Sequence, residues 1–194
     1  TVDGAPVYEN PAVKSRVAFI PDDLYYFLSA STRDMMKFYR GLYPAFDDKR
    51  YQVLKEAFPA VDEKQPIRRL SKGMQKQAHI ILALACQPEY LFCDETFDGL
   101  DPVMRQAVKR LLADAVVEHQ LTPIIASHNL RELEDICDHI GLLHQGGVIF
   151  ERELDSLQSD IHKVQCAFAE PKKPEDFAGL NIITTEQQGL SLIH

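Results

Sequence analysis

Two adjacent carboxylates, Asp94 and Glu95, follow directly on a short apolar run, "YLFC" at residues 90–93. Such a run predicts a buried strand of a parallel sheet. A second apolar run, "TPIIAS" at residues 122–127, ends just before His128. Because chemistry in parallel sheets gathers beyond the carboxyl ends of the strands, we expect Asp94, Glu95 and His128 to face one crevice. These groups could hold Mg²⁺ and activate water, whereas the plain alternative is a polar turn after each strand.

A third group lies in "LSKGMQKQ" at residues 70–77. A Ser at the N-cap of a helix, followed by Gly73, leaves free backbone N–H groups at the positive end of the helix dipole. Lys72 and the neighbouring Arg68 and Arg69 raise the positive potential there, so the segment could bind an anion. Taken in isolation, an ordinary capped amphipathic helix is the favoured interpretation.

The elements that position these groups follow from the apolar pattern and the capping residues. Strands separated by helices predict an α/β fold with a parallel sheet and right-handed crossovers. Residues 160–194 predict a small β-rich appendage. The expected strands cover residues 16–20, 90–93 and 122–127, and two further short strands flank Gln145-Gly146-Gly147. The expected helices begin at Ser31 or Thr32, at Asp47 or Asp48, after Ser71 and at Asp101, and a last helix covers residues 129–139.

Composition narrows the class of protein. The 194 residues are 45% hydrophobic and 26% charged, which is ordinary for a soluble globular protein. A formal charge of −8 argues against a broad nucleic-acid surface. No apolar run approaches the roughly 20 residues that a membrane-spanning helix needs. The four cysteines form no Cys-x-x-Cys pair, so we expect reduced thiols. A local basic spot is formed by Lys64, Arg68, Arg69, Lys72 and Lys76.

Taken together, three motifs resemble those of the ATP-binding cassette (ABC) family. "LSKGMQKQ" resembles the signature motif, "LFCDETFDGLD" the Walker B strand with its D-loop, and "ASHNL" the switch-histidine loop. Their order and spacing agree, with 23 residues from Ser71 to Asp94 and 34 from Asp94 to His128. The resemblance covers roughly residues 16–155.

The resemblance implies a partial P-loop NTPase (ABC ATPase) core with a parallel sheet, an α-helical subdomain and a small β-rich C-terminal extension. On this basis the chain divides into four parts. These are a remnant of the N-terminal core at 1–24, a helical subdomain with the signature at 25–87, a RecA-like core at 88–155 and the extension at 156–194.

The resemblance also assigns roles to single residues. Asp94 would hold Mg²⁺ through a water, Glu95 would act as general base, and His128 would bind the γ-phosphate of ATP. Asp22 stands at the Q-loop position, where it could reach Mg²⁺ through water or form a plain polar turn. The signature residues Ser71, Lys72, Gly73 and Met74 would contact ATP bound mainly by a partner subunit, and the D-loop is Asp98, Gly99, Leu100 and Asp101.

Several positions depart from the family pattern. The signature contains Lys72-Gly73-Met74 where Gly-Gly-Gln is usual, and Thr96-Phe97-Asp98 follows Glu95 in place of Pro-Thr-Ser. No Gly-x-x-x-x-Gly-Lys-[Ser/Thr] loop occurs, and Lys14-Ser15 lacks the glycines that would cradle a phosphate. We therefore expect an N-terminally trimmed piece of a longer protein, or a degenerate subunit, that hydrolyses ATP poorly by itself.

The implied function is that of the ATP-binding and ATP-hydrolysing subunit of a transporter. It would use ATP and Mg²⁺, pair with a second ABC ATPase subunit and drive a separate membrane permease from the cytoplasmic face of the membrane. Tyr25, Tyr26 and Phe27 would receive a permease helix, or are plain core. The alternatives are a non-catalytic cassette half and a soluble ABC protein acting on ribosomes; the DNA-repair kind is disfavoured because no sustained heptads occur between Asp22 and Ser71.

Overall fold

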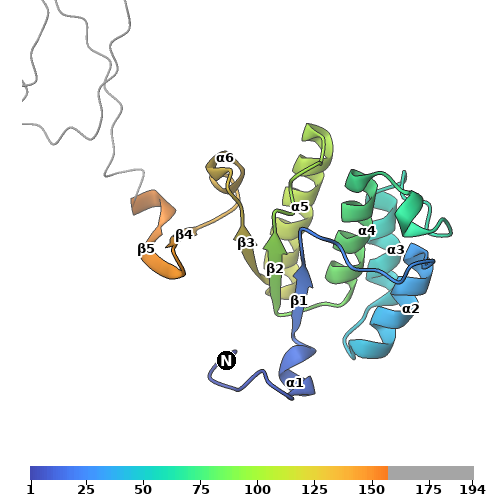
Figure 1. Ribbon diagram of the computed structural model, residues 1–194, viewed down its shortest axis with the longest axis horizontal. Helices are drawn as coiled ribbons and strands as arrows, with labels where there is room; N and C mark the ends of the chain where they lie inside the picture. The colour runs from blue at the N-terminus through green and yellow to red at the C-terminus, as the bar shows by residue number, and fades with distance from the viewer. Residues whose placement is uncertain (157–194) are drawn as a thin grey trace, which may run out of the picture. The chain divides into compact units, whose positions relative to one another are not determined.

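The computed structural model describes residues 1–156, of which Thr1–Leu154 form one compact unit (Figure 1). The β-rich extension predicted for 156–194 lies, apart from residue 156, outside the described residues. Within the compact unit one hydrophobic core joins the residues of the predicted helical subdomain to those of the sheet. The finer boundaries at residues 24 and 87 stay predictions.

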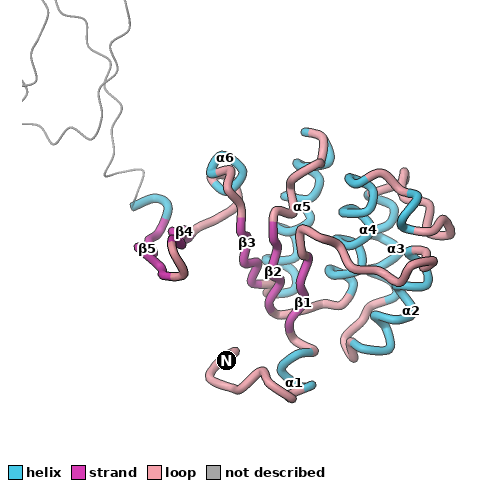
Figure 2. Tube along the Cα trace, viewed as in Figure 1, coloured by secondary structure: helices cyan, strands magenta, loops and turns pink. Residues whose placement is uncertain are grey.

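Three parallel strands form the central sheet in the order β1-β2-β3 (Figure 2). β1 is Val17–Ile20, β2 is Tyr90–Asp94 and β3 is Thr122–Ala126. The predicted parallel sheet is therefore confirmed. Because the strands run the same way, the residues that follow β2 and β3 leave the sheet at the same edge.

Only one face of this sheet is covered in the described part of the chain. Leu91 and Cys93 on β2 are 0% and 2% exposed, and they share a core with α5 (Pro102–His119). Phe92 points to the opposite face and is 39% exposed. The expectation that the whole run 90–93 is buried was wrong for Phe92, because side chains alternate between the two faces of a strand and no described element covers the second face.

Helices begin where the capping side chains predicted. Ser31 caps α2 (Thr32–Leu42) with a reciprocal bond to Asp34, and Asp47 caps α3 (Asp48–Ala57). Asp101 accepts hydrogen bonds from two backbone N–H groups at the start of α5. Each side chain satisfies backbone donors that the first turn of a helix leaves free. A short helix α1 (Pro11–Lys14) precedes β1, and the 3₁₀ turn η1 (Ile67–Arg69) precedes the signature helix.

The signature helix α4 (Lys72–Ala85) is more deeply buried than a single apolar stripe predicts. Every residue from Lys76 to Ala85 is buried, polar ones included. The reason is tertiary: α4 contacts β1 on one side and α2, α3 and η1 on the others (Figure 1). A helix enclosed on several sides is buried around its whole circumference.

The last predicted helix is much shorter than expected. Instead of covering 129–139, helix α6 spans only Leu130–Leu133. The carbonyl oxygen of Leu133 accepts hydrogen bonds from both Ile136 and Cys137 N–H groups, so the chain tightens into a turn after Leu133. It then enters the antiparallel hairpin of β4 (His139–His144) and β5 (Gly147–Glu153), which was predicted around the Gln-Gly-Gly turn.

The cysteines of the described residues are free thiols. Cys86 and Cys93 are buried and Cys137 is half-buried. Burial raises the pKa of the Cys93 thiol to about 12, which keeps it protonated and unreactive at neutral pH. This part of the structure also contains no helix that is both long enough and apolar enough to cross a membrane.

Candidate active site

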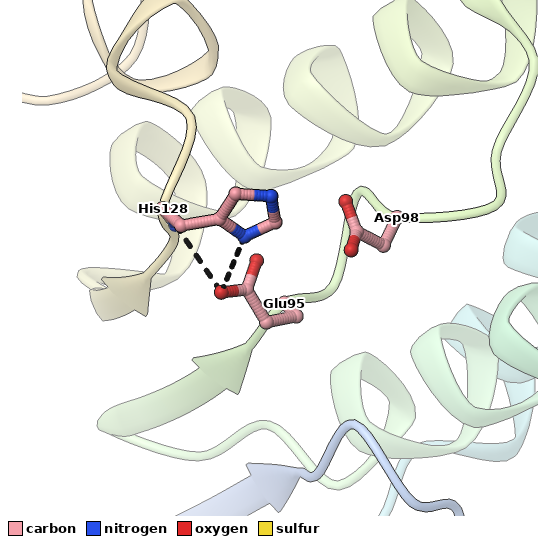
Figure 3. Close-up of side chains that lie close together, drawn as sticks. All are labelled: Glu95, Asp98 and His128. Carbon is pink, nitrogen blue, oxygen red and sulfur yellow. Dashed lines mark hydrogen bonds and ion pairs between the residues drawn. The ribbon is translucent and has the colours of Figure 1, made fainter.

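Glu95 and His128 meet at the carboxyl edge of the sheet (Figure 3). Glu95 leaves β2 with a left-handed backbone, φ 44°, while its N–H still donates to the carbonyl oxygen of Ala126 on β3 at 3.0 Å. Its Oε1 atom lies 2.9 Å from His128 Nδ1 and accepts the His128 backbone N–H at 3.2 Å. The structure therefore brings Glu95 and His128 into contact, as expected, whereas the crevice shared with Asp94 stays a prediction. Their chemical roles stay predictions.

The second carboxylate oxygen of Glu95, Oε2, differs from Oε1 in its surroundings. Oε2 is shielded from solvent, yet it has no hydrogen-bond partner in the described part of the chain. Asp98 lies beside it, and one ligand atom from each of Glu95, Asp98 and His128 lies within 4.8 Å of the others (Figure 3). An orphan acceptor next to a second carboxylate is suited to a water molecule or a cation.

The carboxylates near the end of β2 fit a hard cation, but the imidazole of His128 does not. Mg²⁺ prefers oxygen ligands, so the carboxylates of Asp94, Glu95 and Asp98 suit it, whereas the imidazole nitrogen of His128 does not. Asp94 is half-buried, and its side chain forms no hydrogen bond or ion pair with another residue between 1 and 156. Asp94 is not part of the group formed by Glu95, Asp98 and His128, although it precedes Glu95 directly in the chain. Its role as a metal ligand stays a prediction.

A buried lysine, Lys76, fixes the exit of β2. It is 7% exposed, and its ammonium group donates to the backbone carbonyl oxygen of Glu95 and, at 3.3 Å, to Asp22 Oδ1. Lys76 thus joins α4 to the residue after β2 and to the loop after β1. The sequence grouped Lys76 with a local basic spot, and this grouping was wrong for Lys76 because its side chain is buried and paired inside the protein. Asp22 is 59% exposed in its side chain and contacts this ammonium group.

A buried carboxylate, Glu132, connects the loop before His128 to helix α5. Its Oε1 atom pairs with Arg105 of α5 at 3.1 Å, and its Oε2 accepts the Ser127 hydroxyl at 3.3 Å. The Ser127 hydroxyl in turn accepts the Asn129 N–H. Sequence reasoning missed Glu132 and Arg105. The available signal was weak, because a Glu in a polar helix pattern is ordinarily solvated.

The start of α4 lies against the D-loop. Ser71 caps α4 by accepting the Met74 N–H at 3.3 Å. A Cβ atom added to Gly73 would lie 3.0 Å from the carbonyl oxygen of Gly99, and Gly99 itself has φ +74°. Glycine is therefore favoured at both positions, for close approach at Gly73 and for a left-handed backbone at Gly99. The structure brings signature and D-loop residues together.

The contact with Glu95 has a titratable consequence. The hydrogen bond to Glu95, then the negative charges of Glu95 and Asp98, raise the pKa of His128 above its ordinary value of 6.5. We expect a ¹H NMR titration of the imidazole, assigned with a His128→Gln variant, to give a pKa above 6.5. Since the folded pKa is the higher one, the stabilisation is present below 6.5 and is lost as the pH rises through the folded pKa.

Two variants check the cause of this shift. Glu95→Gln is expected to return the His128 pKa most of the way to 6.5, whereas Asp98→Asn is expected to lower it less, since Asp98 acts only through its charge. A pKa that stays raised in Glu95→Gln would show that the 2.9 Å contact does not govern the titration of His128.

Comparison with known proteins identifies the family of this chain. Residues 1–98 match the family "ABC transporter". The chain is 30% identical over 166 residues to the ABC transporter ATP-binding protein YtrB of Bacillus subtilis, covering 86% of this chain and 56% of YtrB. It is 35% identical over 102 residues to the bacitracin transport ATP-binding protein BcrA of Bacillus licheniformis, covering 53% of this chain and 33% of BcrA.

Solved structures give the same fold. One, described as the ATP binding subunit of an ABC transporter, has a TM-score of 0.70 at 21% identity, over 77% of this chain and 64% of that chain. A bacterial Atm1-family ABC exporter with ATP bound has a TM-score of 0.62 at 21% identity, over 76% of this chain and 27% of that chain. The fold is therefore that of an ABC-type P-loop ATPase, α/β with a parallel sheet.

The chain belongs to the ABC transporter family, as its motifs predicted. Within it, the similar proteins are named as ATP-binding proteins of bacterial transporters. The chain spans about half the length of YtrB and a third of BcrA.

Proposed function

We propose that this chain carries the water-activating half of the ATPase site of a transporter subunit. The single observation that supports this most strongly is the contact of Glu95 with His128 beyond the carboxyl ends of β2 and β3. A carboxylate held by an imidazole, with its other oxygen unpartnered, is the arrangement that a general base requires. The substrate class is a nucleoside triphosphate, and the reaction is hydrolysis of ATP to ADP and phosphate.

Glu95 is the proposed base. Its Oε1 is engaged by the His128 N–H and imidazole, so Oε2 is left to accept the proton of the attacking water. The backbone bond to Ala126 and the Lys76 ammonium group fix where the carboxylate emerges. Asp94 is proposed to hold Mg²⁺ through a water; the ion, when bound, would neutralise the charge of the ATP phosphates.

His128 is proposed to reach the γ-phosphate. Its side chain is 73% exposed, so the ring extends from the sheet edge into the space where a nucleotide would bind. The raised pKa favours the protonated imidazole, which can donate to Glu95 and to a phosphate oxygen at once. Asp22, which contacts Lys76, is the proposed Q-loop residue of this crevice.

The signature and D-loop are proposed to act on a second cassette. Ser71, Lys72, Gly73 and Met74 would contact the γ-phosphate of ATP bound mainly by that partner, and the D-loop Asp98, Gly99, Leu100 and Asp101 would contact the partner itself. Free N–H groups at the start of α4 and the exposed cation of Lys72 support an anion there. The partner is a second ABC ATPase subunit, identical or related.

Exposed aromatic side chains near α2 are the proposed docking surface for a permease. Tyr25 and Phe27 are 68% and 44% exposed and pack edge to face with ring centroids 6.1 Å apart, while Phe27 also contacts Phe38. Tyr26 instead packs against the core. A permease helix on this surface would hold the subunit at the cytoplasmic face of the membrane. The names of the bacitracin and lantibiotic transport relatives support a transport role.

ATP turnover tests the proposal directly. The 194-residue chain alone is expected to release little phosphate from ATP, because it lacks the glycine-rich loop whose N–H groups and Lys bind the phosphates. A longer protein in which such a loop precedes this chain is expected to hydrolyse ATP. Robust Glu95-dependent turnover by the chain alone would contradict the need for that loop, and an inactive complete protein would favour the non-catalytic cassette half.

A further inference from the structure

Next to the loop that carries His128, two charged side chains from different helices form an ion pair. Glu132 of α6 is 4% exposed, and its Oε1 atom lies 3.1 Å from Arg105 Nη1 of α5. A buried carboxylate is costly unless it is paired and hydrogen-bonded, so its partners decide where Glu132 can lie. A buried ion pair is often no more stabilising than apolar side chains of similar size, so stability alone does not account for this pair.

The second oxygen of Glu132 reaches the backbone that surrounds His128. Oε2 accepts the Ser127 hydroxyl at 3.3 Å, and the oxygen of that hydroxyl accepts the Asn129 N–H at 3.1 Å. His128 therefore lies between two residues that are held through one hydroxyl group. Its own backbone N–H donates to Glu95 Oε1 at 3.2 Å. A shift of this loop thus changes the contact between His128 and Glu95.

The D-loop lies at the other end of these contacts. Arg105 Nη2 donates to the carbonyl oxygen of Leu100 at 3.4 Å. The planar guanidinium group has its N–H donors in a fixed arrangement, so it holds Leu100 and Glu132 in defined relative directions. The contacts run from the D-loop to the His128 loop in the order Leu100, Arg105, Glu132, Ser127 and Asn129.

The charge of Glu132 has only a small direct effect on His128. The hydrogen bond from Glu95, and then the charges of Glu95 and Asp98, contribute more than the charge of Glu132 to the raised pKa of His128. Glu132 also forms no hydrogen bond with Glu95 or His128 within the described residues. Its influence on His128 is therefore exerted mainly through the position of the loop.

We propose that Glu132 and Arg105 are positioning residues, which hold the His128 loop so that the imidazole and the backbone N–H of His128 both meet Glu95 Oε1. The inference rests on the proposed function, because it assigns both residues to the same reaction. Neither residue acts on the reacting groups itself. Glu132 acts through Ser127 and the backbone of the loop, and Arg105 acts through Glu132.

The position of the loop can be tested without ATP, by NMR measurement of amide hydrogen exchange in the 194-residue chain. Glu132→Leu removes both interactions, and we expect exchange of the His128 and Asn129 amides to become about five- to tenfold faster, the effect of losing one hydrogen bond. Glu132→Gln offers an amide oxygen to Arg105 and an NH₂ donor to Ser127 Oγ. It is expected to change the same rates by less than about threefold.

Glu134→Leu is the matched control, because Glu134 lies two residues further along the chain and is exposed. It is expected to leave both rates within about twofold, as for most surface substitutions. The amides of β2 report on the core and are expected to keep their exchange rates. Unchanged exchange of His128 and Asn129 in Glu132→Leu would overturn the proposal. So would equal acceleration in β2, because Glu132 would then only stabilise the fold.

Glu132→Asp keeps the test decisive if Glu132→Leu does not fold. It retains the charge but is one methylene shorter, so it cannot reach Arg105 and Ser127 together as Glu132 does. We expect it to accelerate exchange of the His128 and Asn129 amides while β2 is unaffected. Rates equal to those of the unaltered chain would contradict the proposed positioning.

The consequence for catalysis is tested in a longer protein in which a glycine-rich loop precedes this chain. Glu132→Leu is expected to lower kcat for ATP about ten- to hundredfold, because a small misplacement of an active-site group is costly. KM is expected to change less than about threefold, since the glycine-rich loop supplies most contacts to the phosphates. Glu132→Gln is expected to restore most of kcat, and Glu134→Leu to retain all of it.

The two measurements separate the positioning of His128 from the proposed function. Equal loss of kcat in Glu132→Leu and Glu132→Gln would show that the charge of Glu132 is what matters, and would overturn the positioning role. An unaltered longer protein without ATPase activity would contradict the proposed function instead. The exchange rates of the His128 and Asn129 amides would still decide whether Glu132 holds the loop.

Discussion

Replacing Glu95 with Gln is expected to lower ATP turnover of the complete cassette by about 10²–10⁴-fold, the range by which a general base accelerates proton transfer. The amide retains a carbonyl oxygen that can accept the His128 N–H, so the exit of β2 keeps its geometry. What is lost is the basic oxygen at Oε2, the one atom of this carboxylate with no partner within residues 1–156. Phosphate release under single-turnover conditions separates this loss from any change in ATP binding.

A matched control for this experiment lies at the other end of the same strand. Glu89 precedes β2 and pairs with Arg16 at 2.6 Å, far from the carboxyl edge, so Glu89→Gln makes the same chemical change away from the proposed site. We expect Glu89→Gln to keep turnover within about a factor of two, since an exposed ion pair contributes little. Turnover of Glu95→Gln equal to that of the unaltered protein would remove Glu95 from the mechanism.

Replacing Lys76 with Met is expected to lower the free energy of unfolding by about 2 kcal/mol, the cost of losing hydrogen bonds to a charged group in a buried site. Met retains the unbranched shape that packs within α4, so the change removes mainly the ammonium group. The Glu95 carbonyl oxygen then loses its donor, and the link from α4 to Asp22 is broken. Urea denaturation of the 194-residue chain, followed by far-UV circular dichroism, gives the comparison.

Lys72→Met serves as the control, because Lys72 begins the same helix but is exposed. Its expected effect is within about 0.5 kcal/mol, as for most surface substitutions. If Lys72→Met and Lys76→Met shifted the urea midpoint equally, the interactions of the buried ammonium group would not stabilise the exit of β2. A loss in Lys76→Met alone would support the fixation of Glu95 by α4.

The family and most elements could be predicted from sequence because their signals are local. Ser31, Asp47 and Asp101 each satisfy N–H groups within three residues of themselves, so the helix starts follow from short stretches of chain. The meeting of Glu95 with His128 was also predictable, since parallel strands must bring their carboxyl ends to one edge. The end of α6 was not, because a turn at Leu133 depends on where the chain must enter β4.

The sequence by itself determined the class of protein, the parallel sheet and the residues at its carboxyl edge. The order and spacing of the motifs can be read directly from the sequence. Only the tertiary structure decided that Lys76 is a buried cation and that Glu132 is buried and bonded to the His128 loop. The physical reason is that the type of a polar residue predicts exposure, whereas its actual burial depends on partners that are distant in the chain. Lys76 pairs with Asp22, which lies 54 residues earlier in the sequence. A pair so far apart in the sequence produces no periodic pattern that could predict it.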